Sequence, residues 1–318
     1  MALFLSEKDV KQVLTMAMAM EGVESAHRDL AQGQGMDTPR ARTRLPQTVL
    51  HILQGALPAQ GVLGYKAYTS NRSGNRFLVH LFDAASGALL AVIEADFLGM
   101  MRTGAASGVA ARHLARSDSK VAGVFGTGWQ AEGHVRAICA ALPLEKVKVF
   151  GRKGDKLQSF CARLGEATGV AVVPAASAEE TVRGSDLVGT VTSAALPLFE
   201  AEWLEPGTHI NAAGSNALIR QELSEAAVKR CGLICVDAVP TALAEAGDLL
   251  PLLEKGRLHV RQLVELGDVL IGRQVGRTAA EQITLFESQG MAIQDLAVAV
   301  RVLAAARELG LGVALPLA

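Results

Sequence analysis

The stretch KVAGVFGTGWQA, Lys120–Ala131, restricts the possible folds more than any other part of the sequence. Its apolar start, Val121–Phe125, predicts a buried parallel strand, and a helix is expected to begin near Trp129. Between them lie Gly126 and Gly128, which have the G-x-G-x-x-A spacing of a dinucleotide-binding turn. The first glycine permits a tight turn, and the second lets the backbone approach a pyrophosphate that faces the start of the helix.

A second strand, Val147–Phe150, follows this turn and helix, as a βαβ unit requires. The residues expected to contact the dinucleotide are those of the turn: Gly126, Thr127, Gly128, Trp129 and Gln130. An ordinary strand, turn and helix without a ligand is the alternative, and the presence of the second strand argues against it.

The end of this second strand indicates which dinucleotide would bind. NAD-binding domains usually place an acidic residue there, which accepts hydrogen bonds from the ribose hydroxyl groups. Here the strand is followed by Gly151, Arg152 and Lys153, so two cations stand where a 2′-phosphate would lie. The sequence therefore favours NADP(H), with NAD(H) as the second choice of cofactor and a solvated basic turn as the alternative.

Short apolar strands alternate with helices from residue 120 to about residue 290, which predicts a doubly wound parallel sheet. After the first βαβ unit, strands are expected at 170–173, 187–191, 209–212 and 233–236, and the helices at 131–142, 156–168 and 220–230.

The first part of the chain has a different pattern. A helix is expected over residues 6–32 with Ser6 as its N-cap, and turn residues then separate short strands. These strands, at 48–53, 62–68, 76–82 and 88–93, predict a mostly antiparallel sheet. Helices rich in small residues are expected at 96–115 and 294–309.

Four basic residues of this first part, Arg42, Arg44, Lys66 and Arg102, are noteworthy. Lys66 lies inside the apolar strand GVLGYKAYT, where an unpaired ammonium group would be costly; an edge-strand lysine that reaches solvent is the alternative. Arg102 lies near the start of a helix, and its guanidinium group matches a carboxylate in geometry. An exposed surface arginine is the alternative there.

Composition excludes several classes of function. The formal net charge is -1 and half of the residues are hydrophobic, so neither a nucleic acid nor a membrane surface is indicated as a partner. The start MALFLSEKDV lacks the basic region and apolar length of a signal peptide, and no apolar run reaches about twenty residues. The four cysteines form no metal-binding pattern, and we expect free thiols in a reducing cytoplasm and no bound metal.

Several segments, in order along almost the whole chain, resemble the ornithine cyclodeaminase and μ-crystallin superfamily. They are Arg42–Pro46, Gly64–Lys66, Met101–Ser107, the turn GTGWQA, Pro206–Gly214, Arg220–Leu223 and Gly290–Leu296. The resemblance implies an α/β fold in which a Rossmann doubly wound parallel sheet is inserted in a smaller α+β substrate-binding and dimerisation domain. It places the substrate domain at residues 1–116 and 295–318 and the dinucleotide-binding domain at 117–294, and it implies a homodimer.

The resemblance also implies a binding site for a substrate carboxylate, because Arg42, Lys66 and Arg102 match the family's positions. Three cations in one site would hold an α-carboxylate and lower the pKa of the lysine. Lys66 would then also exchange a proton near the reacting carbon. Thr192 and Ser193 are expected to contact the nucleotide, and Gly214 to line its nicotinamide side.

One departure from the family pattern concerns the reaction. Asn216, in the turn after Gly214, stands where the cyclodeaminases carry an acid/base aspartate. An amide cannot take up a proton at neutral pH, although it forms hydrogen bonds; a residue that merely shapes the turn is the alternative.

The departure favours NAD(P)H-dependent reduction of a cyclic imino acid, such as pyrroline- or piperideine-2-carboxylate, to an L-amino acid. Two other functions stay open at this point. One is a lyase, either an ornithine cyclodeaminase or a 3-hydroxyproline dehydratase. The other is a crystallin-like protein that binds NADPH without catalysis.

Overall fold

The computed structural model describes residues 1–152 and 154–316, which form two compact units. Unit 1 comprises Met1–Arg102 and Gly290–Ala318, and unit 2 comprises Thr103–Gln289. The sequence places the borders after residues 116 and 294, whereas the contacts place them after Arg102 and Gln289. Helix α3 (Asp96–Leu114) therefore contributes residues to both units.

Unit 1 contains a seven-stranded sheet, whose strands in spatial order are β15 (Val313–Ala314), β1 (Leu3–Leu5), β6 (Leu89–Glu94), β5 (Gly74–Asp83), β4 (Val62–Asn71), β3 (Thr48–Leu57) and β2 (Met36–Arg44). Among the described residues, β1 and β6 are its one parallel pair. The predicted antiparallel sheet is thus confirmed, and every predicted strand in it is present, with most extended by a few residues.

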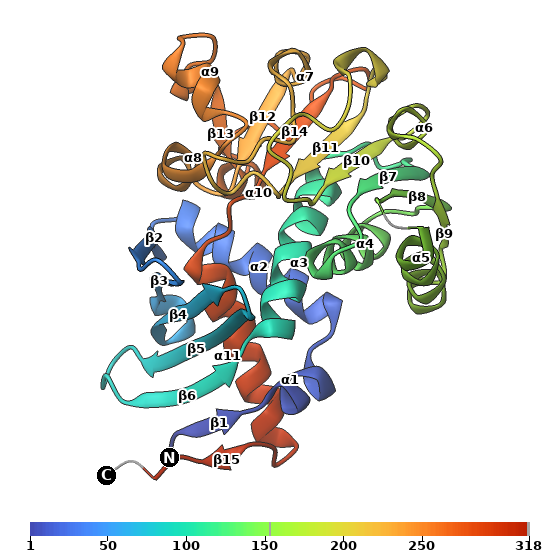
Figure 1. Ribbon diagram of the computed structural model, residues 1–318. Coiled ribbons are helices and arrows are strands. Elements are labelled where there is room, and N and C mark those ends of the chain that lie inside the picture. Colours follow the sequence, from blue (N-terminus) through green and yellow to red (C-terminus); the bar gives the residue numbers. More distant parts are fainter. Residues whose placement is uncertain (153, 317–318) are drawn as a thin grey trace. The chain divides into compact units, whose positions relative to one another are not determined.

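Helix α11 (Ala292–Glu308) packs against β3 and β4 of this sheet, as Figure 1 shows. Two facing glycines make this approach close. A Cβ atom on Gly55 would lie 2.8 Å from Ile293 Cγ2, and one on Gly64 would lie 3.1 Å from Leu296 Cδ2. Larger side chains at these positions would push away the helix that carries Asp295.

The helix predicted over residues 6–32 is divided into α1 (Glu7–Val13) and α2 (Met16–Ala31), so the prediction of one continuous helix is wrong. Ser6 caps α1 as expected, by accepting a hydrogen bond from the Asp9 amide. The chain is then extended at Leu14, and Thr15 starts a new helix by accepting from the Met18 amide at 3.2 Å. Local capping by threonine explains the interruption.

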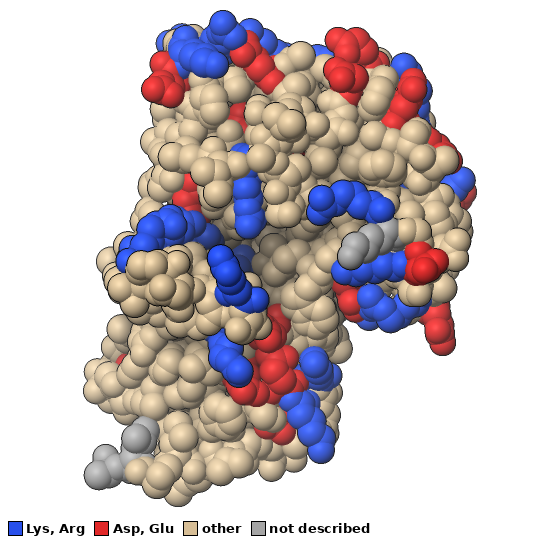
Figure 2. Space-filling view, in the orientation of Figure 1, with Lys and Arg blue, Asp and Glu red and all other residues tan. Residues whose placement is uncertain are grey.

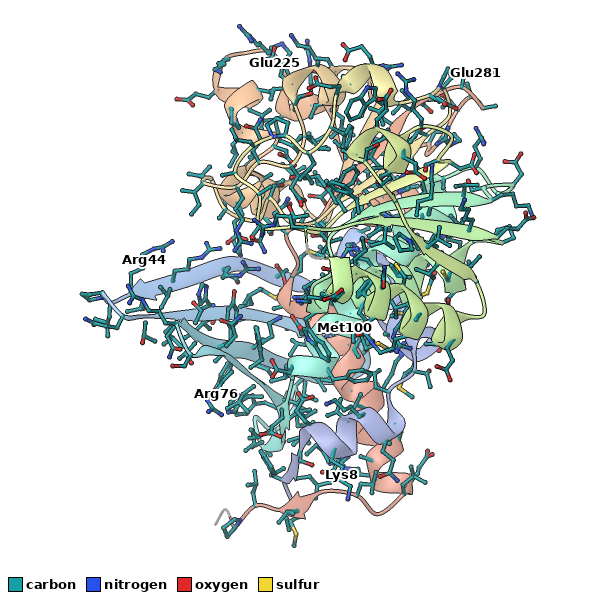
Figure 3. The ribbon with its side chains drawn as sticks, turned by 45° about the vertical axis from the view of Figure 1, so that its right-hand side comes forward. Lys8, Arg44, Arg76, Met100, Glu225 and Glu281 are labelled. Atoms are coloured by element: carbon teal, nitrogen blue, oxygen red, sulfur yellow. The ribbon has the colours of Figure 1, made fainter. Side chains whose placement is uncertain are left out.

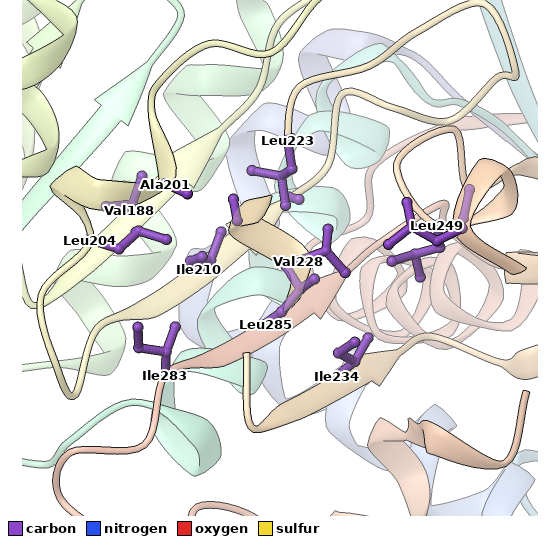
Figure 4. Close-up of a cluster of buried hydrophobic side chains, with 14 of the residues drawn as sticks. Val188, Ala201, Leu204, Ile210, Leu223, Val228, Ile234, Leu249, Ile283 and Leu285 are labelled. Atoms are coloured by element: carbon purple, nitrogen blue, oxygen red, sulfur yellow. The ribbon is translucent and has the colours of Figure 1, made fainter. Parts of the chain in front are cut away.

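Unit 2 is built on a parallel sheet, eight-stranded in the described residues: β13 (Leu263–Glu265), β12 (Leu233–Val236), β14 (Thr284–Glu287), β11 (His209–Ala212), β10 (Leu187–Thr190), β7 (Val121–Phe125), β8 (Lys146–Phe150) and β9 (Ala171–Pro174). The chain moves outward from β7 to β9 and then returns to β10 on the other side of β7, which is the doubly wound arrangement that the sequence predicts. Figure 4 shows part of its core, in which Val188, Ile210 and Leu285 from three adjacent strands pack together.

The helices of unit 2 are α4 (Trp129–Ala141), α5 (Gly154–Thr168), α6 (Ala178–Val182), α7 (Glu225–Lys229), α8 (Val239–Glu245), α9 (Leu250–Glu254) and α10 (Leu266–Leu270). The helix predicted at 220–230 is wrong in its first half. The amides of Glu222 and Leu223 donate to Asp248 Oδ1 at 2.8 and 3.0 Å, and Ser224 caps α7. These side-chain hydrogen bonds compete with a helical start at residue 220.

Acidic and basic side chains are interspersed on the face shown in Figure 2, in keeping with the near-zero net charge. Across the described ranges, no helix is both long and apolar enough to span a bilayer. The four cysteines are free thiols. No cluster of metal-binding side chains occurs in the described part of the chain.

Candidate active site

Lys66 is buried in the middle of the unit 1 sheet. Its strand, β4, pairs with β3 on one side and β5 on the other, so the alternative of an edge-strand lysine that reaches solvent is wrong. Only 2% of its surface is exposed. A buried ammonium group requires a partner of opposite charge, because desolvation of an isolated cation is costly.

That partner is Asp295, in the first part of α11. The Lys66 Nζ atom lies 2.9 Å from each oxygen of the Asp295 carboxylate. The same carboxylate accepts a hydrogen bond from Arg102 Nε at 2.9 Å. Arg102 is 6% exposed, so the alternative of a surface arginine is also wrong. Two cations and one carboxylate thus form a buried cluster with one net positive charge when Lys66 is protonated.

Burial lowers the pKa of the Lys66 ammonium group to about 7, and the charges of Arg102 and Arg40 act in the same direction. Asp295 opposes this effect through its charge and its hydrogen bond. Near neutral pH, Lys66 is therefore able to lose and regain a proton, as an acid/base group must.

A further chain of hydrogen bonds holds the guanidinium group of Arg102. Its Nη1 atom donates to Gln294 Oε1 at 3.0 Å, and Gln294 Nε2 lies 3.0 Å from Nε2 of the buried His27. Gly290 lies directly against the guanidinium group with a φ of +82°, and a Cβ atom there would lie 2.5 Å from Nη1. Arg102 is thus fixed by three segments of unit 1.

Arg42 lies on the same face of the sheet as Lys66, but two strands away. It is paired with His51 in β3, and His51 is paired with Tyr68 in β4. A β-bulge between Thr38 and Ala41 shifts the register of β2. The bulge adds one residue to β2, so that Asp37, opposite Gly55 before the bulge, and Arg42, opposite His51 after it, lie on one face of the sheet. Figure 3 shows Arg44 near the end of this strand.

Aromatic side chains flank Lys66 on this face. Its Nζ atom lies 5.9 Å from the centroid of the Tyr68 ring and 5.8 Å from that of Phe77, within the range of cation–π attraction. His51 stacks on Tyr68 with a centroid separation of 4.2 Å. Burial, followed by the charges of Arg40, Arg42 and Arg44, lowers the pKa of His51 to about 4, so its ring is neutral at pH 7.

The glycine turn of unit 2 has the geometry that a dinucleotide needs. Gly126 has a φ of +119°, and a Cβ atom on it would lie 2.6 Å from the Val191 carbonyl oxygen. Gly128 is the N-cap of α4. A Cβ atom on it would have no heavy atom of the described residues beyond its chain neighbours within 4 Å. Gly128, as the N-cap, contributes no side-chain hydrogen bond to the start of α4, and amide groups at such a helix start bind phosphates in dinucleotide-binding turns. These residues fit the pyrophosphate of a dinucleotide.

The other residues that were predicted to bind the cofactor lie at the ends of the central strands. Trp129 is 47% exposed at the start of α4, and the Thr127 side chain packs against Gly151. Gln130 is half-buried in α4, and Arg152 is exposed after β8. Lys153 lies outside the described residues.

Glu222, a buried carboxylate that was not predicted as a site residue, joins the loops after β10 and β11. It accepts hydrogen bonds from the Thr192 amide at 2.6 Å, from Thr192 Oγ1 at 2.7 Å and from the Gly214 amide at 2.8 Å. Ser193, next to Thr192, is exposed. Glu222 therefore fixes the backbone at two positions that were predicted to contact the nucleotide.

Asn216 is half-buried after Gly214, and its Oδ1 atom accepts a hydrogen bond from Arg220 Nη1 at 3.2 Å. Ser215, directly before it, is buried and donates a hydrogen bond to Glu287 Oε1. Burial first, and then the charge of Asp248, raise the pKa of Glu287 well above its usual value. This part of unit 2 therefore contains buried carboxyl groups of elevated pKa behind the turn.

Asp295 and Gln294 were not predicted as site residues, although the segment that carries them was quoted for the resemblance. Asp295 lies 229 positions from Lys66 and 193 from Arg102 in the sequence. Its position in the first turn of an apolar helix is also typical of an ordinary acidic residue near a helix N-terminus, so no local pattern reveals the pairing.

Comparison with known proteins agrees with this geometry. The chain is 35% identical over 283 residues to a Δ1-pyrroline-2-carboxylate reductase of Bacillus cereus, which covers 85% of this chain and 87% of the relative. The structure of the Thermococcus litoralis Δ1-pyrroline-2-carboxylate reductase in complex with NADH and L-proline superposes with a TM-score of 0.94 at 30% identity, covering 98% of this chain and all of that one.

An archaeal alanine dehydrogenase dimer with bound NAD superposes with a TM-score of 0.92 at 32% identity, and 98% of each chain is covered. The model of the ornithine cyclodeaminase/mu-crystallin family matches residues 1–309. The expected resemblance is therefore confirmed, and the chain belongs to the ornithine cyclodeaminase/mu-crystallin family.

Proposed function

We propose that this protein is a nicotinamide-dependent reductase that converts a cyclic imino acid to the L-amino acid. Its relatives and structural neighbours include Δ1-pyrroline-2-carboxylate reductases, one of them in complex with NADH and L-proline. Pyrroline-2-carboxylate and piperideine-2-carboxylate are accordingly the substrates of first choice. Each combines a carboxylate with a neighbouring C=N bond, and the enzyme has to recognise the first and protonate the second.

The observation that carries this proposal is the buried cluster of Lys66, Arg102 and Asp295. Its single net positive charge balances one substrate carboxylate. We assign Arg102 and Lys66 to carboxylate binding, with Arg42 contributing from the same face of the sheet. The pKa of Lys66, about 7, suits a group that also supplies a proton at neutral pH.

The nicotinamide, when bound, supplies the hydride that adds to the imine carbon. Lys66 donates its proton to the imine nitrogen, so that an N–H bond forms as the π bond of C=N breaks. The lysine then regains a proton from solvent. Arg102, fixed by Asp295 and Gln294, holds the carboxylate still during this transfer.

For the cofactor we propose NADP(H) as the preferred form. The turn Gly126–Gln130 and the amides at the start of α4 would hold the pyrophosphate, with Thr192, Ser193 and Gly214 along the nucleotide. Arg152, exposed after β8, would meet the 2′-phosphate.

A lyase reaction is less well supported, because Asn216 cannot act as the base that ring closure of ornithine requires. We assign Asn216 a hydrogen-bonding role at the substrate instead. The two reactions differ in their use of cofactor, since a reductase consumes one NAD(P)H per product and a cyclodeaminase consumes none.

Absorbance at about 340 nm separates these functions. Mixtures of the enzyme with NADPH or NADH and a panel of cyclic imines, or of keto acids with amines, should lose this absorbance in proportion to the amino acid formed. Conversion of ornithine without loss of absorbance would indicate a lyase. Binding of NADPH without turnover of any imine would indicate a non-catalytic protein.

We further propose a homodimer, as the archaeal alanine dehydrogenase is a dimer. The free cysteines, two of them buried, support a reducing compartment such as the cytoplasm. Sedimentation equilibrium tests the first of these proposals.

A further inference from the structure

We propose that Asp295 is a positioning residue that keeps Lys66 cationic beside Arg102, so that the enzyme takes up a proton together with the substrate carboxylate. This inference rests on the function proposed above and adds to it a source for the proton.

Charged and titratable groups from several elements surround Lys66. The groups are Asp295 on α11, Arg102 on α3, Asp37, Arg40 and Arg42 on β2, His51 on β3 and Tyr68 on β4 itself, while His27 of α2 reaches the cluster through Gln294. Asp295 is the anion among them that touches the ammonium group, at 2.9 Å. Arg102 and Arg40 both favour the neutral amine.

The Asp295 carboxylate is shared between two cations. It is fully buried, and it receives hydrogen bonds from Lys66 Nζ and Arg102 Nε. One carboxylate therefore compensates one of two positive charges, and the second is left for an anion from outside. Removal of the proton from Lys66 would leave Arg102 and Asp295 as a neutral pair, with no charge to offer a substrate.

A carboxylate that binds beside this cluster has the same effect on Lys66 as Asp295 has. Both are anions next to the ammonium group, and each favours its protonated form. Since the free enzyme holds this proton only weakly near neutral pH, binding of a carboxylate draws a proton onto Lys66. That proton then lies next to the imine nitrogen to which it is transferred.

Calorimetry on the wild-type protein with saturating NADP⁺ tests this coupling directly. The probe is pyrrole-2-carboxylate, a ring carboxylate whose aromatic ring resists hydride addition. Titrations in buffers of different ionisation enthalpy give the number of protons bound. At pH of about 8 we expect uptake of close to one proton per carboxylate, falling towards zero near pH of about 6. No uptake at the higher pH would overturn the proposal, as would failure of the probe to bind.

The role of Asp295 is tested by the pH dependence of probe affinity. In the wild type, the dissociation constant should be level at acidic pH and rise about tenfold per pH unit above the pKa of Lys66. In Asp295→Asn the inflection of the dissociation constant should move to lower pH by about one unit or more. The reason is that the amide is uncharged, so the negative charge that favours protonated Lys66 is lost. Asp295→Glu should restore the inflection in part. An unmoved inflection with uniformly weaker binding would show a structural role only and would overturn the assignment.

Two controls complete the design. Asp118→Asn changes an exposed carboxylate that pairs with Arg116, and it should leave the inflection in place. Circular dichroism establishes whether Asp295→Asn is folded, and the wild-type proton count decides the question if it is not. The proposed reaction and the proton coupling are tested by different measurements. If the reaction is wrong, no cofactor is oxidised in the imine screen, while the probe still binds together with a proton.

Discussion

Two regions of the molecule, one in each unit, bury charge in opposite ways. In unit 1, Asp295 touches two cations, and the cluster keeps one net positive charge. In unit 2, Glu222, Asp237, Asp248 and Glu287 are buried carboxyl groups whose described hydrogen bonds come from backbone amides and from serine, threonine and glutamine side chains. The first arrangement attracts an anion from outside. The second repels one, and burial raises the pKa of Glu222, Asp248 and Glu287.

The difference has a functional meaning. Buried cations that outnumber the neighbouring anions form a binding site, because an added carboxylate neutralises the remaining positive charge. Buried acids that accept hydrogen bonds from backbone amides fix loops, because each amide is held at a defined place. We therefore expect substitutions in unit 1 to change chemistry and pH dependence, and those among the acids of unit 2 to change stability and cofactor binding.

Lys66→Met should have the largest effect. It removes the proton donor that we propose and cancels the net charge of the cluster, so kcat/KM for a cyclic imino acid should fall by about a thousandfold. Steady-state kinetics measures this loss. Lys120→Met, in an exposed ion pair with Glu145, is the matched control and should retain the wild-type rate. Equal losses in both variants would contradict the distinction between buried and solvated lysines.

Glu222→Gln tests whether the acids of unit 2 fix loops. The amide side chain cannot accept all the hydrogen bonds from Thr192 and Gly214, so affinity for NADPH should fall about thirtyfold, with a loss of about 2 kcal/mol in unfolding free energy. Fluorescence titration and urea unfolding measure the two effects. Glu225→Gln, labelled in Figure 3 on the same unit, should leave NADPH affinity unchanged.

Arg152→Gln tests whether an exposed cation of unit 2 recognises phosphate. We expect affinity for NADPH to fall about tenfold while that for NADH stays the same, because only the former carries a 2′-phosphate. Arg183→Gln, an exposed arginine on the same unit, provides the control. A ratio of affinities that does not change on Arg152→Gln removes this residue from the cofactor site.

Glu287→Gln should give the smallest effect, and one that depends on pH. A carboxyl group whose pKa is raised in the folded protein loses its proton first in the unfolded chain, so stability falls as pH rises above the ordinary value for glutamate. Glutamine lacks this titration. The free energy of unfolding of the variant should therefore exceed that of the wild type by about 1 kcal/mol at pH of about 8, and by less at pH of about 5.

Urea unfolding at both pH values measures this gain. Glu281→Gln, an exposed position of the same unit labelled in Figure 3, should show no such pH dependence. A constant difference between Glu287→Gln and the wild type at the two pH values would indicate that Glu287 is ionised in the folded protein.

Much of the fold was predictable because it depends on local pattern. Apolar runs fix β7, β11 and β12, which begin and end at the predicted residues. Predictions failed where side chains compete for backbone amides, as Thr15 does within the first helix and Asp248 does at Glu222. Whether a side chain forms such a hydrogen bond with a backbone amide depends on which residues the tertiary structure brings next to it.

The candidate site was predictable in part for a similar reason. Lys66 and Arg102 stand out because a cation in an apolar segment needs an explanation, and the structure does bring these two together. Asp295 and Glu222 do not stand out, because an acidic residue is ordinary at a helix start or in a loop. Their importance comes from partners far away in the sequence, which only the folded chain identifies.

The bulge in β2 decides which face of the sheet Arg42 occupies. Asp37 and Arg42 are five positions apart, so a regular strand would put them on opposite faces, whereas the extra residue of the bulge puts both on one face. If β2 kept its register at Asp37 and lost the bulge with no residue removed, Arg42 would turn away from the face on which Lys66 lies, and that face would lose one positive charge.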